Sequence, residues 1–223
     1  MKARLIKREE IIPSFWEIEF EPVNEQIVFE PGQFFNLTLI HPHVTDDRGY
    51  SRYFGFTNLP NQPTFKMLMK TGISAFKKTL LSLPEETEVE IDKIGGENNI
   101  AKNPNSPLVF VVCGVGIAPV ISMIRFYFEK NLTNKLVLFY ANYESEALPF
   151  VNELQDLEKR GSNFKLVLTK DLNELILREN LPDFNNYLYF IRGASKFVIT
   201  SMQVIKSLGV EQNKISIEIF TGY

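Results

Sequence analysis

The chain has 223 residues, of which 44% are hydrophobic and 23% are charged, and its formal net charge is −3. This length suffices for one large domain or for two small domains with separate cores, and so small and mixed a charge argues against nucleic acid or a membrane surface as a partner. The single cysteine, Cys113, excludes an internal disulfide and a cysteine-ligated iron–sulfur cluster within this chain.

The N-terminal residues 1–10 are charged and alternate in polarity, without the apolar core of a signal peptide. No apolar run along the chain reaches about 18 residues, the length that a bilayer requires. We therefore expect a cytoplasmic protein with no segment inserted in a membrane.

The first hundred residues predict a series of short strands, because runs rich in β-branched and aromatic residues are separated by Pro, Gly and Asn clusters. The expected strands are residues 3–7, 15–20, 34–40, 53–57, 65–70 and 87–94. One helix is expected at residues 75–82, where Ser74 can cap its start and Pro84 follows its end. Many short strands with one helix indicate a small antiparallel β-barrel.

Two histidines, His41 and His43, flank Pro42 in a loop-like stretch of this region. Zinc normally takes three or four protein ligands, and no further ligands accompany this pair. We expect no metal site.

The composition of the sequence changes at residues 95–107, which form a polar stretch, rich in turn-forming residues, that is typical of a linker. Beyond it we expect strands at 108–113, 135–141, 164–168, 187–192 and 215–219, with helices at 119–129, 150–160 and 196–207. Buried apolar strands alternating with amphipathic helices indicate an α/β domain with a doubly wound parallel sheet. The expected domains are residues 1–100 and residues 101–223.

The strongest local signal is the turn Gly114-Val115-Gly116, which joins an apolar strand to a helix through Ile117, Ala118 and Pro119. Glycines at such a turn let a phosphate approach the backbone, and the helix N-terminus supplies N–H donors and the positive end of a dipole. Proline suits the start of a helix because that position needs no N–H donor. Many α/β loops carry a Gly-x-Gly without a ligand, so the turn alone leaves a purely structural role open.

The segment GVGIAP at 114–119 resembles the nicotinamide-binding turn of the ferredoxin–NADP reductase superfamily. Three further segments are similar to the family in order and spacing: YANY at 140–143 with LPF at 148–150, YFIRGA at 189–194, and EIFTGY at 218–223. In the first half, PGQF at 31–34 resembles the start of a barrel strand. RYFGFTNLP at 52–60 falls where the family's flavin signature belongs.

The resemblance implies a flavin-binding barrel followed by an NAD(P)-binding domain, and it implies roles for individual residues. Arg52 would pair with a flavin phosphate through its planar guanidinium, Phe54 would stack on the isoalloxazine ring, and the N–H groups of the helix start at Ser74 would bind phosphate. In an extended segment Arg52, Phe54 and Phe56 project to one face. The alternative is that both phenylalanines are plain core and Arg52 is a surface residue.

These considerations give a set of expected site residues. The cofactor-binding residues expected in the first half are Arg52, Tyr53, Phe54, Gly55, Phe56, Thr57, Lys70, Gly72, Ser74, Ala75 and Phe76. Those expected in the second half are Gly114, Val115, Gly116, Ile117, Ala118, Pro119, Asn142, Gly193 and Phe220. The residues expected at the reacting centre are Phe54, Gly55, Arg192 and Tyr223.

The chain departs from the family pattern at three of these positions. The hydroxyl residue that usually bonds the reactive flavin nitrogen is Gly55, the distal serine is Asn58, and the frequent cysteine before the second-domain glycine is Arg192. We expect slow flavin reduction, with Thr57 as the nearest substitute for the hydroxyl, and faster reduction in Gly55→Ser. A second register beginning at Arg48 copies the signature's opening more closely but breaks its spacing to Pro60.

The expected cofactor is bound FAD, with FMN as the alternative. NADH is favoured over NADPH because Glu144 and Glu146 follow the second strand, where carboxylates repel a 2′-phosphate. The expected function is a flavoprotein oxidoreductase that passes electrons to an acceptor the sequence does not identify. The alternative is a non-catalytic or regulatory module that keeps the fold and the cofactor.

Overall fold

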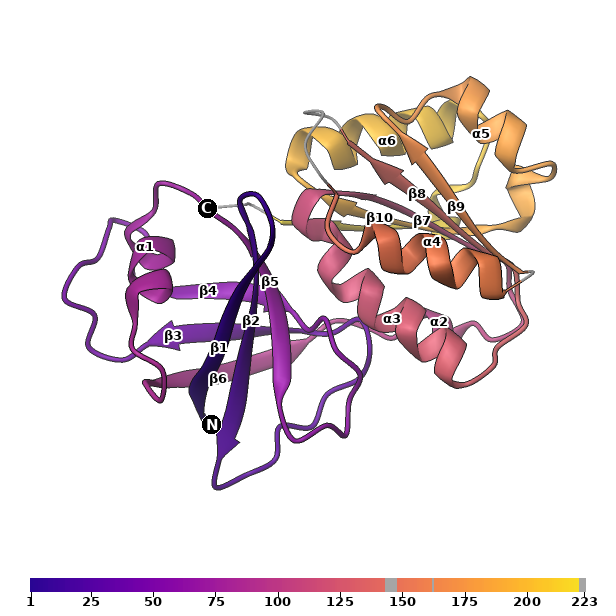
Figure 1. Cartoon of the computed structure of the whole chain (residues 1–223). Coiled ribbons are helices and arrows are strands. Elements are labelled where there is room, and N and C mark those ends of the chain that lie inside the picture. The colour runs from indigo at the N-terminus through magenta and orange to yellow at the C-terminus, as the bar shows by residue number, and fades with distance from the viewer. Residues whose placement is uncertain (143–147, 162, 221–223) are drawn as a thin grey trace. The chain divides into compact units, whose positions relative to one another are not determined.

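The structure, a computed structural model, describes residues 1–142, 148–161 and 163–220. It divides into two compact units (Figure 1). The first unit holds Met1–Asn99 together with Ala118–Phe126, and the second holds Ile100–Ile117 and the chain from Tyr127 onward. No helix in the described part of the chain is long and apolar enough to cross a membrane.

The first unit is a curled antiparallel sheet with the strand order β4-β3-β6-β1-β2-β5. Its elements are β1 (Lys2–Ile12), β2 (Phe15–Val23), β3 (Phe34–Leu39), β4 (Ser51–Gly55), β5 (Phe65–Lys70), α1 (Ala75–Ser82) and β6 (Glu88–Gly95). The two edges of the sheet meet just after β4, where Phe56 pairs with Met67 and the Thr57 N–H donates to the Lys66 carbonyl oxygen at 2.9 Å. The expected barrel with one helix is confirmed as a sheet closed at this point.

Phenylalanine fills the interior of this sheet and explains its frequency in the sequence. Phe29 and Phe56 stack with ring centroids 3.8 Å apart, and Phe35 lies 4.5 Å from Phe56 and 5.3 Å from Phe65. Burying each such side chain stabilises the fold by about 1.5–3 kcal/mol. Phe56 is fully buried in this cluster, so its side chain is core.

The second unit is a parallel sheet with the order β11-β10-β7-β8-β9. Its strands are β7 (Leu108–Cys113), β8 (Leu136–Ala141), β9 (Phe164–Thr169), β10 (Leu188–Gly193) and β11 (Ile215–Ile219), and its helices include α4 (Val151–Arg160), α5 (Glu174–Asn180) and α6 (Ser195–Ser207). Helices lie on both faces of the sheet (Figure 1). The expected doubly wound fold is confirmed.

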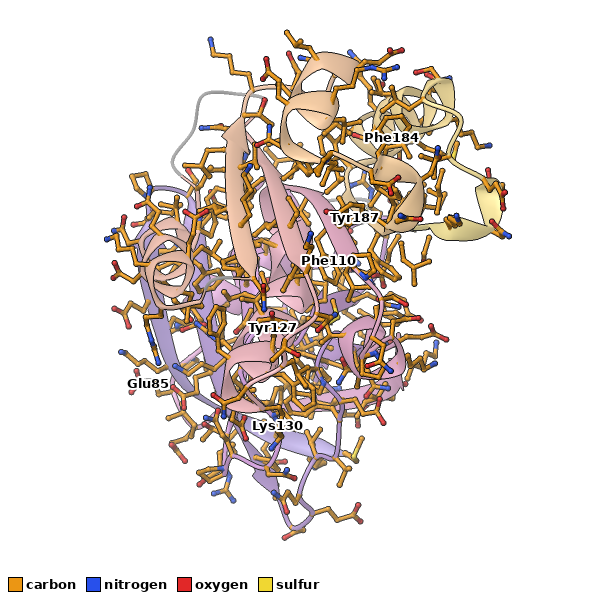
Figure 2. The ribbon with its side chains drawn as sticks, turned by 90° about the vertical axis from the view of Figure 1, so that its right-hand side faces the viewer. Glu85, Phe110, Tyr127, Lys130, Phe184 and Tyr187 are labelled. Carbon is orange, nitrogen blue, oxygen red and sulfur yellow. The ribbon has the colours of Figure 1, made fainter. Side chains whose placement is uncertain are left out.

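The parallel sheet changes direction of winding at β7, because β8 follows on one side of it and β10 lies on the other. Phe110 of β7 (Figure 2) packs on Phe190 of β10 with ring centroids 5.3 Å apart, which joins the two halves of the sheet. In open α/β sheets ligands bind beyond the carboxyl ends of the strands at such a switch point. The turn after β7 and the end of β10 stand at that edge.

Some boundaries differ from those expected. β4 begins at Ser51, two residues earlier than predicted, and α3 (Ile117–Glu129) includes two residues before Pro119. Two helices were not predicted: α2 (Asn99–Lys102), within the stretch expected to be a linker, and α5. The side chain of Asn173 caps α5 by accepting a hydrogen bond from the Ile176 N–H at 3.0 Å, and Leu177 anchors the helix in the core.

Candidate functional site

The alternation of β4 places Arg52 and Phe54 on the inner face of the curled sheet. The Arg52 side chain is 10% exposed and Phe54 is 8% exposed, whereas Tyr53 between them points outward and is 52% exposed. Tyr53 instead packs edge-on against Phe34 at 5.6 Å. Of the three, Arg52 and Phe54 are therefore the residues that can face a ligand from inside the sheet.

Arg52 is held in place by the backbone of the residues that precede it. Its Nη1 donates to the carbonyl oxygens of Arg48, Gly49 and Ser51 at 2.8, 3.2 and 2.7 Å, and its Nη2 donates to Asp46 Oδ1 at 3.2 Å. The guanidinium carbon lies 5.2 Å from the centre of the Phe76 ring. The arginine is thus a fixed cation beside the start of α1.

The start of α1 presents its N–H groups to the same place. Ser74 caps the helix, its hydroxyl accepting from the Lys77 N–H at 3.3 Å, and the Ala75 N–H donates to Asp46 Oδ2 at 2.9 Å. The Asp46 carboxylate therefore joins Arg52 to the helix start. Partial burial acts to raise the pKa of Asp46, but hydrogen bonds from the Ala75 and Arg48 N–H groups and the Arg52 charge outweigh it, so this pKa lies below its ordinary value.

Two lysines add positive charge to this corner of the first unit. Lys77 is buried, and its pKa is lowered by that burial and by the nearby charges of Arg52 and Lys70. Gly72 lies against this lysine, since a Cβ built there would be 3.4 Å from Lys77 Nζ. Lys70, at the end of β5, has its Nζ 5.7 Å from the centre of the Phe15 ring. The expected residues Arg52, Lys70, Ser74 and Ala75 thus form one cationic corner.

The Arg52 guanidinium and the Ala75 N–H form a donor set that fits an anionic oxygen, because the Asp46 carboxylate already accepts from both. Backbone N–H groups at a helix start and a planar guanidinium are the donors that phosphate groups use. A groove of about 740 Å³ adjoins the corner, lined by residues of α1 and of the loop before β4, among them Asp46, Arg48, Ser74 and Ala75. The flavin phosphate expected here is compatible with the residues present.

Phe54 packs on Phe76 of α1 with ring centroids 6.0 Å apart and an angle of 27° between the ring planes. Little of its surface reaches solvent. A flavin ring can therefore use Phe54 as one apolar wall, in company with Phe76, rather than as a free-standing stacking surface.

Gly55 has no room for a side chain. A Cβ at this position would lie 2.7 Å from Cδ and 2.9 Å from the backbone N of Pro119, which belongs to the same compact unit. Real Cβ atoms do not approach backbone this closely, so a serine requires the start of α3 to move. The expectation that Gly55→Ser simply restores a hydroxyl is corrected.

Thr57, the suggested substitute for that hydroxyl, and its neighbour Asn58 already have hydrogen-bond partners within the first unit. Thr57 is fully buried and its Oγ1 donates to Glu17 at 3.0 Å, while Asn58 donates to the Leu59 and Thr64 carbonyl oxygens at 3.0 Å. The carbonyl oxygens of Thr57 and Asn58 accept from Arg125 and Ser122 of α3, both at 2.7 Å. The expectation that Thr57 replaces the hydroxyl is therefore corrected too, because its own hydroxyl serves the sheet.

In the second unit, the turn after β7 lies beside the end of β10. Residues Gly114–Gly116 form a single turn of 3₁₀-helix that leads into α3, and a Cβ at Gly116 would lie 2.5 Å from the Arg192 carbonyl oxygen. Glycine is required there because the turn passes directly against the backbone at the end of β10. Gly114 has a φ of +52° with open space around it, and Ile117, Ala118 and Pro119 are buried. The turn therefore presents backbone at the switch point.

The Arg192 side chain is buried in this unit and paired with a side chain of the neighbouring strand. It is 5% exposed and forms an ion pair with Glu218 at 2.6 Å, across the pairing of β10 with β11. The arginine that replaces the family's cysteine is thus held by the neighbouring strand.

The remaining expected residues lie along the same edge of the sheet. Asn142 follows β8 and its N–H donates to Thr169 at 2.7 Å, and the Phe220 N–H donates to the Gly193 carbonyl oxygen at 2.9 Å. Val115 is half-buried in the turn. Tyr223, Glu144 and Glu146 lie outside the described residues.

Comparison with known proteins shows what the chain is similar to. Residues 110–175 match the family model described as an oxidoreductase NAD-binding domain. A flavohemoprotein of Rhodopirellula baltica is 23% identical over 98% of this chain and 59% of its own length, and ferredoxin–NADP reductase B of Sorangium cellulosum is 26% identical over 75% of this chain and 68% of its own length. These matches support the ferredoxin–NADP reductase superfamily as the family of this chain. The chain spans about three fifths of the flavohemoprotein.

The fold of the superfamily is the fold described above. The ferredoxin–NADP⁺ reductase of Plasmodium falciparum has 17% sequence identity to this chain and superposes with a TM-score of 0.81, over 98% of this chain and 95% of the other. At that identity the likeness concerns the fold alone.

Asp46 is the site residue that the sequence did not reveal. It is the partner of both Arg52 and Ala75, yet it lies in a turn-like stretch with no periodicity. Aspartate followed by glycine three residues later is an ordinary turn signal, and the Gly49 N–H indeed donates to the Asp46 carbonyl oxygen at 2.8 Å.

Proposed function

We propose that this superfamily member is an NAD(P)H-dependent flavin oxidoreductase, which takes a hydride from a pyridine nucleotide onto a flavin in the first unit and passes the electrons to an acceptor. The observation that carries the proposal is the cationic corner at Arg52 and the α1 start, a phosphate-binding donor set on the unit where the family resemblance expects flavin. The flavin, when bound, supplies the hydride-accepting ring.

The residues of this chain bind and orient the two ligands. Arg52 and the Ala75 N–H hold the flavin phosphate, while Phe54 and Phe76 give the ring an apolar wall that excludes water. The backbone of Gly114–Gly116 and the start of α3 receive the diphosphate of the nucleotide at the sheet's switch point.

We favour FAD over FMN as the flavin. The groove beside α1 has about 740 Å³ and extends from Ser74 to Ser82, with exposed apolar side chains at Val44 and Ile73. Ligand pockets of about 300–1,000 Å³ hold groups the size of a nucleoside and larger. An adenosine half fits this groove when the diphosphate lies at the cationic corner.

We favour NADH over NADPH, as inferred from the carboxylates Glu144 and Glu146 after β8. Reduction rates with each nucleotide, compared as kcat/KM, decide this preference. A higher value for NADPH would show that selectivity is set elsewhere.

The flavin part of the proposal is tested by titration. Full-length protein stripped of any bound flavin is titrated with FAD and with FMN, and the chromophore of freshly purified protein is released with acid and identified by chromatography. FAD binding in the micromolar range or tighter supports the proposal, and binding of neither flavin ends it.

A second function remains open, that of a flavin- or nucleotide-binding module without fast hydride transfer. Two observations favour it: Gly55 carries no hydroxyl and has no room for one, and Arg192 is bound to Glu218. The two functions separate cleanly, because such a module binds FAD but is not reduced by NADH.

A further inference from the structure

The Asp46 carboxylate occupies the place that the proposed function gives to a flavin phosphate. Oδ2 accepts from the Ala75 N–H at 2.9 Å, and Oδ1 accepts from the Arg48 N–H at 3.1 Å and from Arg52 Nη2 at 3.2 Å. These are a helix-start N–H, a loop N–H and a guanidinium, the donors that a phosphate oxygen uses. A phosphate and the carboxylate cannot both take these hydrogen bonds.

The loop that carries Asp46 is held by hydrogen bonds to Arg52 and Ala75 but contributes no buried residue. It runs from residue 40 to residue 50 between β3 and β4, and none of these residues is buried. Segments with few buried contacts open at low free-energy cost. Asp46 can therefore leave the α1 start by a movement of this loop, without disturbing the sheet.

The charges around Asp46 favour an anion with more than one negative charge. The carboxylate forms an ion pair with Arg52, and the positive charges of Arg52 and Lys70 both act on Lys77 nearby. Arg52 also keeps one buried donor, Nε, for which the described residues offer no acceptor. A diphosphate brings more negative charge and more acceptor oxygens than one carboxylate supplies.

We propose that Asp46 is an internal competitor for the flavin phosphate, an inference that rests on the proposed function. In the free protein it fills the anion site and holds the loop, and a phosphate-bearing flavin binds only after displacing it. The affinity for FAD and FMN is lowered accordingly, whereas riboflavin, which has no phosphate, binds without this displacement. Asp46 thereby weakens the binding of phosphorylated flavins and narrows the difference between their affinity and that of riboflavin.

The size of the effect follows from the fraction of molecules whose site is open. If Asp46 occupies the site in about nine of ten molecules, the apparent Kd for FAD lies about tenfold above that of an open site. Removing the carboxylate abolishes this increase in apparent Kd for FAD and FMN, and it leaves the Kd of riboflavin unchanged.

The test compares Asp46→Asn with Glu25→Gln by calorimetric titration of the flavin-free full-length proteins with FAD, FMN and riboflavin. Glu25 is exposed and does not line the groove beside α1, and its substitution changes the net charge equally. We expect Asp46→Asn to bind FAD and FMN about tenfold more tightly and riboflavin within about twofold of the original chain. Glu25→Gln should change all three affinities by less than about twofold. Asp46→Ala serves as a second variant that removes the hydrogen-bonding group as well.

Equal changes for all three flavins, or no tightening in either Asp46 variant, would overturn the proposal and leave the flavin function intact. If no flavin binds any of the proteins, the proposed function fails, and thermal unfolding with inorganic pyrophosphate decides the role of Asp46 separately. Stabilisation of Asp46→Asn but not of the original chain supports an internal competitor. Stabilisation of neither contradicts it.

Discussion

Gly55 shows how packing between two segments can fix a residue type in a binding site. A Cβ at this position would meet Pro119, so the position where the family resemblance expects a hydroxyl is here a contact between backbone and proline ring. Because α3 residues Ser122 and Arg125 bond to the carbonyl oxygens of Asn58 and Thr57, the helix is anchored over this segment.

We expect Gly55→Ser to destabilise the flavin-free protein by about 1–3 kcal/mol, the usual cost of overpacking. Urea unfolding of both proteins measures this difference. Gly72→Ala is the matched control, since a Cβ there meets only the flexible end of Lys77, and it should cost less. A Gly55→Ser protein as stable as the original would show that Pro119 yields readily.

Arg52 joins the ligand corner to the loop before β4. We expect Arg52→Ala to weaken FAD binding by about 1.5–3 kcal/mol, because one charge-assisted contact is lost. Arg52→Lys keeps the charge but not the planar fork, so it should recover only part of the affinity. Both effects are measured most cleanly in an Asp46→Asn background, where the internal carboxylate no longer competes.

Riboflavin provides the control for Arg52. Its affinity should change little in either Arg52 variant, because it presents no phosphate to the guanidinium. A loss that is equal for riboflavin and FAD would mean that Arg52 acts through the shape of the loop, whose carbonyl oxygens it binds.

At the scale of single residues, strand alternation was sufficient to predict that Arg52 and Phe54 share a face. The Ser74 capping pattern was sufficient to predict where α1 begins. Neither could predict Asp46, because its contact with Ala75 spans 29 positions and depends on where the loop folds back. The close approach of Pro119 to Gly55 spans 64 positions and was unpredictable for the same reason.

Among the elements, the pairing of β10 with β11 carries a buried ion pair that includes Arg192, a residue that the family resemblance places at the reacting centre. Arg192 and Glu218 are register partners, and the arginine is almost fully buried. Removing one member of a buried pair leaves an uncompensated charge.

We expect Glu218→Gln to destabilise the protein by about 1–3 kcal/mol. This is less than the cost of removing one member of a fully buried ion pair, because Glu218 retains some exposure. Arg192→Met combined with Glu218→Gln should cost less than the sum of the single changes, as a double-mutant cycle in urea measures. Additive costs would show that the two side chains do not interact.

Elements with strong internal signals were predicted well. The continuous apolar runs of β7 and β8 are unmistakable, and their observed bounds lie within one residue of those expected. β4 was displaced by two residues because its start is polar, and its extent depends on pairing with β3. The short helices α2 and α5 were missed because α2 has only four residues and α5 has only seven.

At the scale of the whole molecule, the two compact units have different proposed roles, flavin binding in the first and nucleotide binding in the second. The curled antiparallel sheet holds an anion-binding corner at one helix start, and the parallel sheet holds a glycine turn at its switch point. Each unit thus has its own recognition chemistry in the proposed function.

The proposed function requires that this chain bind a flavin and that a pyridine nucleotide reduce it. The most direct measurement is anaerobic stopped-flow mixing of the FAD-loaded full-length protein with excess NADH, followed by the visible absorbance of the oxidised flavin. We expect the absorbance to bleach in a single turnover and to return when air is admitted. A protein that holds FAD but keeps its full visible absorbance with NADH and with NADPH would contradict the account and establish the non-redox module instead.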